Sequence, residues 1–162
     1  IINRYETKSS LDIVGFINDD YLEYLKRLTN QLGLDEYVNF IPALNDLSKI
    51  YSDYDALFMP TQTKEPFGLV IIEAMQYGVV CFAINRFGPK DIIQHEKTGI
   101  LVNSDSPQEW AKQFNHYRYN HSLLKFIRES ALEQLSARHC LEKRAREVSD
   151  LLTRIASGQI KA

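Results

Sequence analysis

The stretch that most restricts the fold runs from residue 56 to residue 84. It begins with a short apolar run, Ala56–Met59, and ends with a second one, Val79–Ile84, in which every residue is apolar. A polar loop and a nine-residue helical segment closed by Gly78 lie between them. Strands that are apolar along their whole length are typical of parallel sheets covered by helices on both faces. The stretch therefore predicts a strand–helix–strand unit within such a sheet.

The same alternation of strand and helix extends along the whole chain, and helices follow the last strand. The predicted strands are Leu11–Phe16, Tyr37–Pro42, Ala56–Met59, Val79–Ile84 and Ile100–Val102. The predicted helices are Tyr21–Leu32, with Asp19 or Asp20 as its cap, a short one through Leu47, Ile50 and Tyr51, 69–77, Pro89–Ile93, Pro107–Tyr117, His121–Leu135 and Leu141–Ala156. This order predicts an α/β fold, a doubly wound parallel sheet with helices on both faces followed by C-terminal helices. With no repeat or linker visible, residues 1–162 are predicted to form one domain.

Composition and charge narrow the function classes. The 162 residues are 44% hydrophobic and 25% charged, as in ordinary globular proteins with a real core. A net charge of -2 without a basic tract argues against nucleic-acid binding. No apolar run is long enough to suggest a transmembrane helix. The start at Ile1, without an apolar signal segment, predicts a fragment of a longer protein.

The two cysteines do not indicate a disulfide framework. Cys81 lies in an apolar run and Cys140 in a helical segment, so both are interpreted as small apolar residues. Because no metal-ligand spacing surrounds either residue, we predict no metal site. A reducing compartment follows, and we expect a cytoplasmic location.

Two carboxylates, Glu65 in the loop and Glu73 on the helix, stand eight positions apart. The helical neighbours of Glu73 all look buried: Leu69, Val70, Ile72, Ala74 and Tyr77. An unpaired buried carboxylate is costly, so Glu73 must face a partner, a polar cleft or a ligand. A structural interpretation is open for each, since Glu65 suits the dipole at a helix start and Glu73 suits a buried salt bridge.

The loop that contains Glu65 follows the carboxyl end of a strand, where ligands bind in parallel α/β sheets. The helix that begins after Gly68 offers unpaired N–H groups and a positive dipole end to an anion such as phosphate. Gly68 also permits close approach of the backbone, and a carboxylate accepts hydrogen bonds from two hydroxyls at once. These residues predict an anionic ligand with hydroxyl groups, bound between a helix start and two carboxylates.

The segment Glu65–Met75 resembles the E-x7-E signature of family 4 of the retaining glycosyltransferases. Further segments match the family in the same order, and the resemblance covers roughly residues 11 to 156: Leu11–Gly15, Val38–Ile41, Leu57–Pro60, Phe87–Pro89 and Thr98–Val102. It implies the Rossmann-like C-terminal domain of the GT-B fold, which binds a nucleotide-sugar donor. The family typically needs no metal, and the resemblance implies no cofactor beyond the donor substrate.

The resemblance also implies roles for single residues. Glu65 would contact the donor sugar near the reacting carbon as the catalytic residue, and Glu73 would hold the ribose hydroxyls. The remaining donor-binding positions are Gly15 in the cleft, Leu44 at the nucleobase, and Phe67, Gly68, Leu69 and Val70 at the sugar and diphosphate. The implied partners are a UDP- or GDP-sugar and the protein's own N-terminal acceptor domain, which would also carry any membrane contact.

Several positions depart from the family pattern. Pro42 stands in place of a glycine, Phe87 replaces the first glycine of a G-G-P turn, and Asp91 replaces a glutamate. The family's phosphate-binding arginine and lysine, with their strand, precede the matching region and are missing here. For Arg86 and Lys90, surface charges on a loop are favoured over contacts to the diphosphate.

The sequence thus predicts the donor-binding domain of a retaining glycosyltransferase, inactive on its own. The whole enzyme would transfer a hexose-type sugar to a glycan or lipid-linked acceptor in polysaccharide biosynthesis, in the cytoplasm or peripherally at the inner face of the membrane. The alternative is a non-catalytic scaffold or partner subunit with a GT-B-like fold. A phosphate-sugar epimerase of similar architecture fits poorly.

Overall fold

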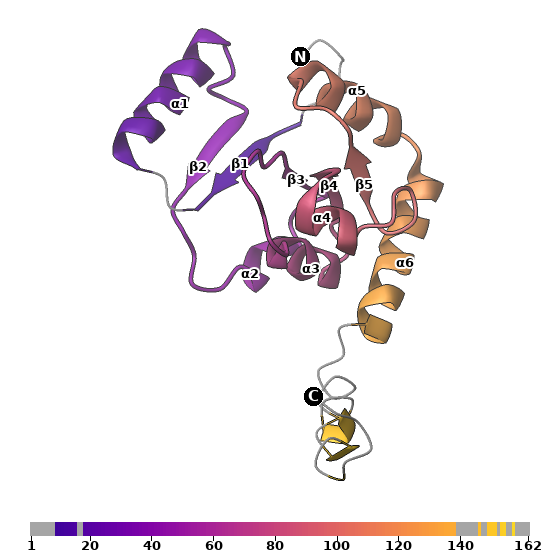
Figure 1. Cartoon of the computed structure of the whole chain (residues 1–162). Coiled ribbons are helices and arrows are strands. Elements are labelled where there is room, and N and C mark those ends of the chain that lie inside the picture. The colour runs from indigo at the N-terminus through magenta and orange to yellow at the C-terminus, as the bar shows by residue number, and fades with distance from the viewer. Residues whose placement is uncertain are drawn as a thin grey trace. The chain divides into compact units, whose positions relative to one another are not determined.

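A computed structural model describes residues 9–15, 18–138, 146, 149–151, 153, 154 and 157. Most of the predicted helix Leu141–Ala156 falls outside the described residues, as does Cys140. The chain forms two compact units, residues 1–49 and residues 50–162. Each unit is described by itself below (Figure 1).

The first unit contains a parallel strand pair joined by a helix. Its elements are β1 (Leu11–Val14), α1 (Asp19–Gln31) and β2 (Val38–Ile41). The register pairs Leu11 with Val38 and continues to Val14 with Ile41. The Asn39 side-chain amide donates a hydrogen bond to the Asp12 carboxylate across the strands at 2.8 Å. Strand, helix and strand follow the predicted order.

The start of α1 differs from the expectation that Asp19 or Asp20 caps it. Asn18 is the N-cap, and its side-chain oxygen accepts hydrogen bonds from the N–H groups of Asp20 at 2.9 Å and Tyr21 at 3.4 Å. Asn is among the best N-cap residues because its short side chain reaches these N–H groups. Asp19 and Asp20 lie in the first turn instead, where the helix dipole favours their charge.

The second unit is built on a three-stranded parallel sheet in the order β3-β4-β5. The strands are β3 (Ala56–Met59), β4 (Val80–Ile84) and β5 (Ile100–Val102). The helices are α2 (Ser48–Tyr51), which crosses the boundary between the units, α3 (Leu69–Gln76), α4 (Phe87–Ile92), α5 (Pro107–Tyr117) and α6 (His121–Arg138). These elements lie where the sequence predicts them, apart from shifts at their ends.

The α/β class with parallel strands and flanking helices is confirmed. Among the described residues, however, the strands hydrogen-bond in two sheets, β1-β2 and β3-β4-β5, rather than in one. The apolar pattern of a strand reports which of its faces are buried. It does not report which neighbour its backbone edge meets, and that limit explains the difference.

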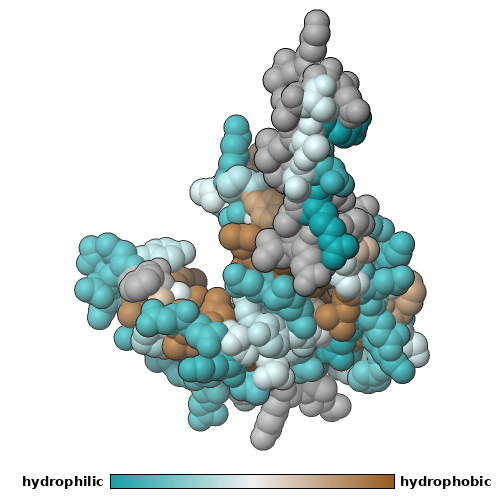
Figure 2. Space-filling view, turned by 90° about the horizontal axis from the view of Figure 1, so that it is seen from below, coloured by the Kyte–Doolittle hydropathy of each residue, from teal (hydrophilic) through white to brown (hydrophobic). Residues whose placement is uncertain are grey.

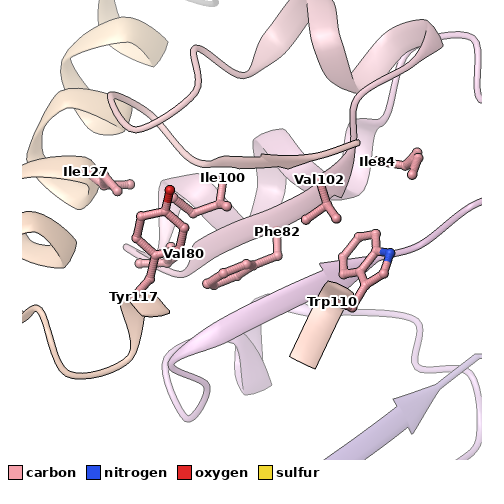
Figure 3. Packing of buried hydrophobic residues seen from close by; sticks show 8 residues of the cluster. All are labelled: Val80, Phe82, Ile84, Ile100, Val102, Trp110, Tyr117 and Ile127. Atoms are coloured by element: carbon pink, nitrogen blue, oxygen red, sulfur yellow. The ribbon is translucent and has the colours of Figure 1, made fainter. Parts of the chain in front are cut away.

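Strand β4 is the centre of the core. Its five residues are all buried, and side chains alternate between the two faces of a sheet. Val80, Phe82 and Ile84 pack with the side chains of α5 and α6 that Figure 3 labels, Trp110, Tyr117 and Ile127. On the other face the Cys81 thiol approaches the carbonyl of Ile71 in α3 at 3.7 Å. Helices therefore cover both faces of this sheet, as predicted.

The aromatic residues of α5 complete one side of this core. The indole N–H of Trp110 donates to the Ser104 carbonyl at 2.8 Å, so its polar atom is satisfied although the side chain is buried. Phe114 meets Phe58 and Phe82 edge-on at ring distances of 5.4 Å and 5.9 Å. Trp110 and Phe114 therefore both belong to the core of this unit, Phe114 as a partly buried residue packed against it.

The surface seen in Figure 2 intersperses hydrophobic side chains with hydrophilic ones. Several large apolar residues are exposed, among them Leu69 and Phe67 next to the start of α3. No helix in the described part of the chain combines the length and the apolar character that crossing a membrane requires.

The buried Cys81 generates a first prediction. Burial raises the pKa of its thiol from 9.0 to about 12, so the folded state keeps the proton at pH values where the unfolded state loses it. Its contribution to stability is complete below pH 9 and falls as the pH rises towards 12. In a Cys140→Ser variant, which leaves Cys81 as the single thiol, we expect alkylation at pH 8 only after denaturant is added. Rapid labelling of the native protein would contradict this burial.

Candidate functional site

The loop of residues 60–68 joins the carboxyl end of β3 to the start of α3. Within it the partly buried Glu65 folds back on its own loop. One oxygen, Oε1, accepts hydrogen bonds from the N–H groups of Gly68 at 2.8 Å and Phe67 at 3.3 Å. Glu65 thus acts as a side-chain cap at this helix start, where a negative charge is favoured. This contact fixes the direction of its carboxylate.

The Glu65 cap leaves part of the helix start open. The Gly68 N–H is bonded to Glu65, and helical bonding begins with Ile71 N–H to Gly68 carbonyl at 3.0 Å. Among the described residues, the N–H groups of Leu69 and Val70 meet no acceptor. Gly68 itself has φ of +90° and is buried, a backbone conformation that disfavours any other residue. Two N–H groups therefore remain for an anion.

The turn at the start of α4 lies directly against this loop. The Gly88 N–H donates to the Glu65 carbonyl at 2.9 Å. A Cβ atom on Gly88 would lie 2.6 Å from the Phe67 carbonyl oxygen, closer than real contacts allow. Only glycine permits this approach, and the contact ties α4 to the segment 65–67.

Phe87 holds a strained backbone at the same place. Its φ is +53°, in the left-handed region that costs a residue with a side chain about 1–2 kcal/mol. In the family pattern a glycine stands at the position of Phe87, and a glycine would adopt this conformation without strain. The surrounding contacts, above all that of Gly88, impose it on Phe87.

Glu73 has a partner that the sequence did not reveal. The Tyr51 hydroxyl donates a hydrogen bond to Glu73 Oε2 at 3.2 Å. Burial, followed by the nearby Glu73 carboxylate, raises the pKa of Tyr51 above its ordinary value. The tyrosine ring also stacks on Tyr77 at 5.6 Å with an interplanar angle of 16°. No local pattern links residues 22 positions apart, so nothing in the sequence indicated this pair.

The surroundings of Glu73 correct the expectation that its neighbours are buried. Ile72 and Ala74 are buried, but Leu69 is 63% exposed and Tyr77 45% exposed. Residues four apart share one helical face, so Leu69, Glu73 and Tyr77 form an exposed stripe along α3. Glu73 lies on this stripe, facing outward, and not within an apolar core.

The predicted site residues fall in both units. Glu65, Phe67, Gly68, Leu69, Val70 and Glu73 lie together at the start of α3 in the second unit. Gly15 and Leu44 belong to the first unit and follow the carboxyl ends of β1 and β2, with the Gly15 N–H donating to the Ile41 carbonyl at 3.1 Å. The structure therefore groups the residues predicted for the sugar, diphosphate and ribose within the second unit, while Gly15 and Leu44 follow the two paired strands of the first unit.

The charged side chain just before α4 forms an ion pair within the protein. Arg86 pairs with Asp105 at 2.6 Å, which agrees with the preference for a surface role over a diphosphate contact. Among the residues that the structure describes, no group of three or more His, Cys, Asp or Glu side chains gathers as metal ligands.

Comparison with known proteins provides evidence that is independent of the site's geometry. Residues 3–134 match the family model described as Glycosyl transferases group 1. An uncharacterized glycosyltransferase of Haemophilus influenzae is 36% identical over 104 residues, which are 64% of this chain and 29% of that protein. The GDP-Man:Man(3)GlcNAc(2)-PP-Dol alpha-1,2-mannosyltransferase of Dictyostelium discoideum is 31% identical over 149 residues, 88% of this chain and 26% of that protein. The chain spans between 26% and 37% of the length of such relatives.

A similar solved structure is that of HepE from Anabaena in complex with UDP. It is 25% identical with a TM-score of 0.83, and the match covers 90% of this chain and 41% of HepE. The same protein in complex with UDP-glucose has a TM-score of 0.81 at 25% identity, over 89% of this chain and 40% of HepE.

The strain at Phe87 generates a second prediction. Phe87→Gly and Phe87→Ala both remove the ring, but only glycine relieves the positive φ. We expect the glycine variant to be more stable than the alanine variant by about 0.5–1 kcal/mol in urea denaturation. At the exposed helical position Lys90, the matched pair Lys90→Gly and Lys90→Ala should show the opposite order, since alanine is the better helix former. Equal behaviour of the two pairs would show that Phe87 is not strained.

Proposed function

The chain belongs to the group 1 glycosyl transferases, and from this premise we propose that it is the donor-binding domain of a retaining glycosyltransferase. The whole protein transfers a hexose-type sugar from a UDP- or GDP-sugar to a glycan or lipid-linked acceptor. The observation that carries this proposal is the arrangement at the start of α3. Two open N–H groups and an outward-facing carboxylate lie on one short helix.

The spacing on α3 suits a nucleoside diphosphate. The N–H groups of Leu69 and Val70 lie at the positive end of the helix dipole, where a diphosphate is favoured. Glu73 follows Leu69 by four residues, about 6 Å along the helix axis and on the same face. A diphosphate bound at the helix start therefore places its ribose within reach of the Glu73 carboxylate. Support also comes from HepE, whose structures contain UDP and UDP-glucose.

In the proposed reaction, the bond between the anomeric carbon and the diphosphate oxygen breaks, and a bond from that carbon to the acceptor hydroxyl oxygen forms. The acceptor proton passes to the departing phosphate. Negative charge grows on the diphosphate, and the Leu69 and Val70 N–H groups stabilise it where it develops. Glu65, whose direction its own loop fixes, faces the donor sugar in this proposal. The backbone of Phe67 and Gly68 borders the same sugar.

The remaining assignments extend the same proposal. Residues 1–162 serve as the donor-binding domain, in which Gly15 and Leu44 are the donor-binding residues of the first unit, Leu44 at the nucleobase. The acceptor is bound by an N-terminal domain, which provides any peripheral contact with a membrane, so the isolated chain is inactive. The reaction uses the donor as substrate without a further cofactor, in a cytoplasmic pathway of polysaccharide synthesis.

The ribose contact gives a third prediction. Glu73→Ala removes hydrogen bonds to a charged acceptor, so we expect the Kd for UDP or GDP to rise by at least about tenfold in calorimetric titration. The substitution should also abolish the preference for the ribonucleotide over its 2′,3′-dideoxy analogue. Glu133→Ala, at an exposed position of α6, is the matched control and should bind normally. Absence of UDP and GDP binding in the unsubstituted protein would favour a scaffold, and unchanged binding by Glu73→Ala would remove the ribose assignment.

A fourth prediction separates the two roles of Glu65. Glu65→Gln keeps an oxygen that can accept from Gly68 and Phe67 but loses the charge. We expect the free energy of unfolding to change by no more than about 1 kcal/mol. Sugar transfer by the whole protein should fall by at least about 100-fold. Glu65→Ala should lower both stability and turnover. Normal transfer by Glu65→Gln would leave Glu65 with a capping role alone.

A further inference from the structure

The buried Tyr51 contacts two residues of the exposed stripe of α3, Glu73 and Tyr77. The residue is 6% exposed, and a buried phenol hydroxyl normally needs a hydrogen-bond partner. Its partner is Glu73 Oε2 at 3.2 Å, an atom of the carboxylate proposed above to hold the ribose. Both residues lie in the second unit. The buried hydroxyl of Tyr51 is therefore hydrogen-bonded to the carboxylate that is proposed to bind the donor.

Tyr51 is held on α3 at a second point. Its ring stacks on Tyr77 with 5.6 Å between centroids and 16° between planes. Tyr77 follows Glu73 by four residues, so the two lie on the same face of α3. With ring and hydroxyl both engaged, the Tyr51 side chain has little freedom to turn away from Glu73.

The hydrogen bond acts on the carboxylate in a defined way. An exposed glutamate samples several rotamers, and ordering it upon binding costs conformational entropy. The bond to Oε2 selects those rotamers that keep this oxygen near Tyr51 and leaves Oε1 available to hydroxyl groups of a ligand. A phenol keeps its proton at neutral pH, and burial with the Glu73 charge raises the pKa of Tyr51 further, so the hydroxyl remains a donor.

We propose that Tyr51, braced by Tyr77, is a positioning residue that preorders Glu73 for the ribose of the nucleotide donor. The proposal rests on the function proposed above. It assigns to α2 and the end of α3 a part in donor affinity, although neither residue touches the donor in this scheme. The gain comes from preorganisation, which lowers the entropic cost of binding.

Tyr51→Phe tests the proposal, because it keeps the ring and its stacking and removes only the hydroxyl. The probes are UDP and GDP, each compared with its 2′,3′-dideoxy analogue, in calorimetric titrations of the whole protein. We expect the Kd of the better-bound ribonucleotide to rise about three- to tenfold and that of its dideoxy analogue less than about twofold.

Tyr117→Phe is the matched control. Tyr117 is also buried and donates its hydroxyl to a glutamate, Glu96, at 2.6 Å, yet neither residue belongs to α2 or α3. Thermal melting should show that both variants remain folded, while Tyr117→Phe keeps the ribonucleotide Kd. An equal loss of affinity in both variants would overturn the proposal, because a general loss of stability would then explain it.

A double substitution distinguishes this inference from the proposed function. In a Glu73→Ala background, Tyr51→Phe should have no further effect on the Kd, and an additional loss there would overturn the positioning role. If Glu73→Ala weakens binding but Tyr51→Phe does not, the positioning role alone fails. If Glu73→Ala binds the ribonucleotide normally, the ribose assignment fails and this inference with it.

Tyr77 provides a second pair of variants that does not depend on the Tyr51 hydroxyl. Tyr77→Phe keeps the stacked ring and should keep the Kd. Tyr77→Ala removes the brace and should raise the ribonucleotide Kd in the same direction as Tyr51→Phe. A normal Kd in Tyr77→Ala would overturn the bracing role of Tyr77.

Discussion

Burial of β4 on both faces is the constraint on which the larger unit depends. Val80, Phe82 and Ile84 face α5 and α6, while Cys81 faces α3. Because alternate side chains point to opposite sides, this strand is stable only between two layers of helices. The helices that follow β3 and β4 must therefore return across the sheet from its carboxyl edge. These helices are α3 and α4. Their first residues lie at that edge, where Gly88 of α4 contacts the loop that contains Glu65.

In the candidate site the two carboxylates both accept hydrogen bonds from within the protein. Glu65 accepts from its own loop, and Glu73 accepts from Tyr51. These contacts serve stability, but they also hold each carboxylate in one direction. A preordered site loses less conformational entropy on binding than a mobile one. The positive φ of Phe87 acts in the opposite direction, because it lowers stability locally and persists only through the packing of its neighbours.

Sequence patterns predicted the larger part of the fold. Apolar runs located β3, β4 and β5, and helical spacing located α1, α5 and α6 with small errors at their ends. Three features were missed for one physical reason. The division into two sheets, the cap by Asn18 and the exposure of Leu69 and Tyr77 depend on what each element meets. Periodicity reports the apolar face of an element, but it does not identify the partner or decide between adjacent capping residues.

The features of the candidate site likewise divide into those that the sequence determines and those that depend on tertiary contacts. The sequence by itself determined the spacing of Glu65 and Glu73 and the glycine between them, because these are properties of one continuous segment. It also determined the family, because the matching segments follow one another in order along the chain. Only the tertiary structure decided that Tyr51 is the partner of Glu73 and that Gly88 lies against Phe67. Those contacts join residues about twenty positions apart, and they arise from how helices pack against β4. A linear pattern holds no record of such packing, since it is settled by shape and hydrogen bonding after the chain has folded.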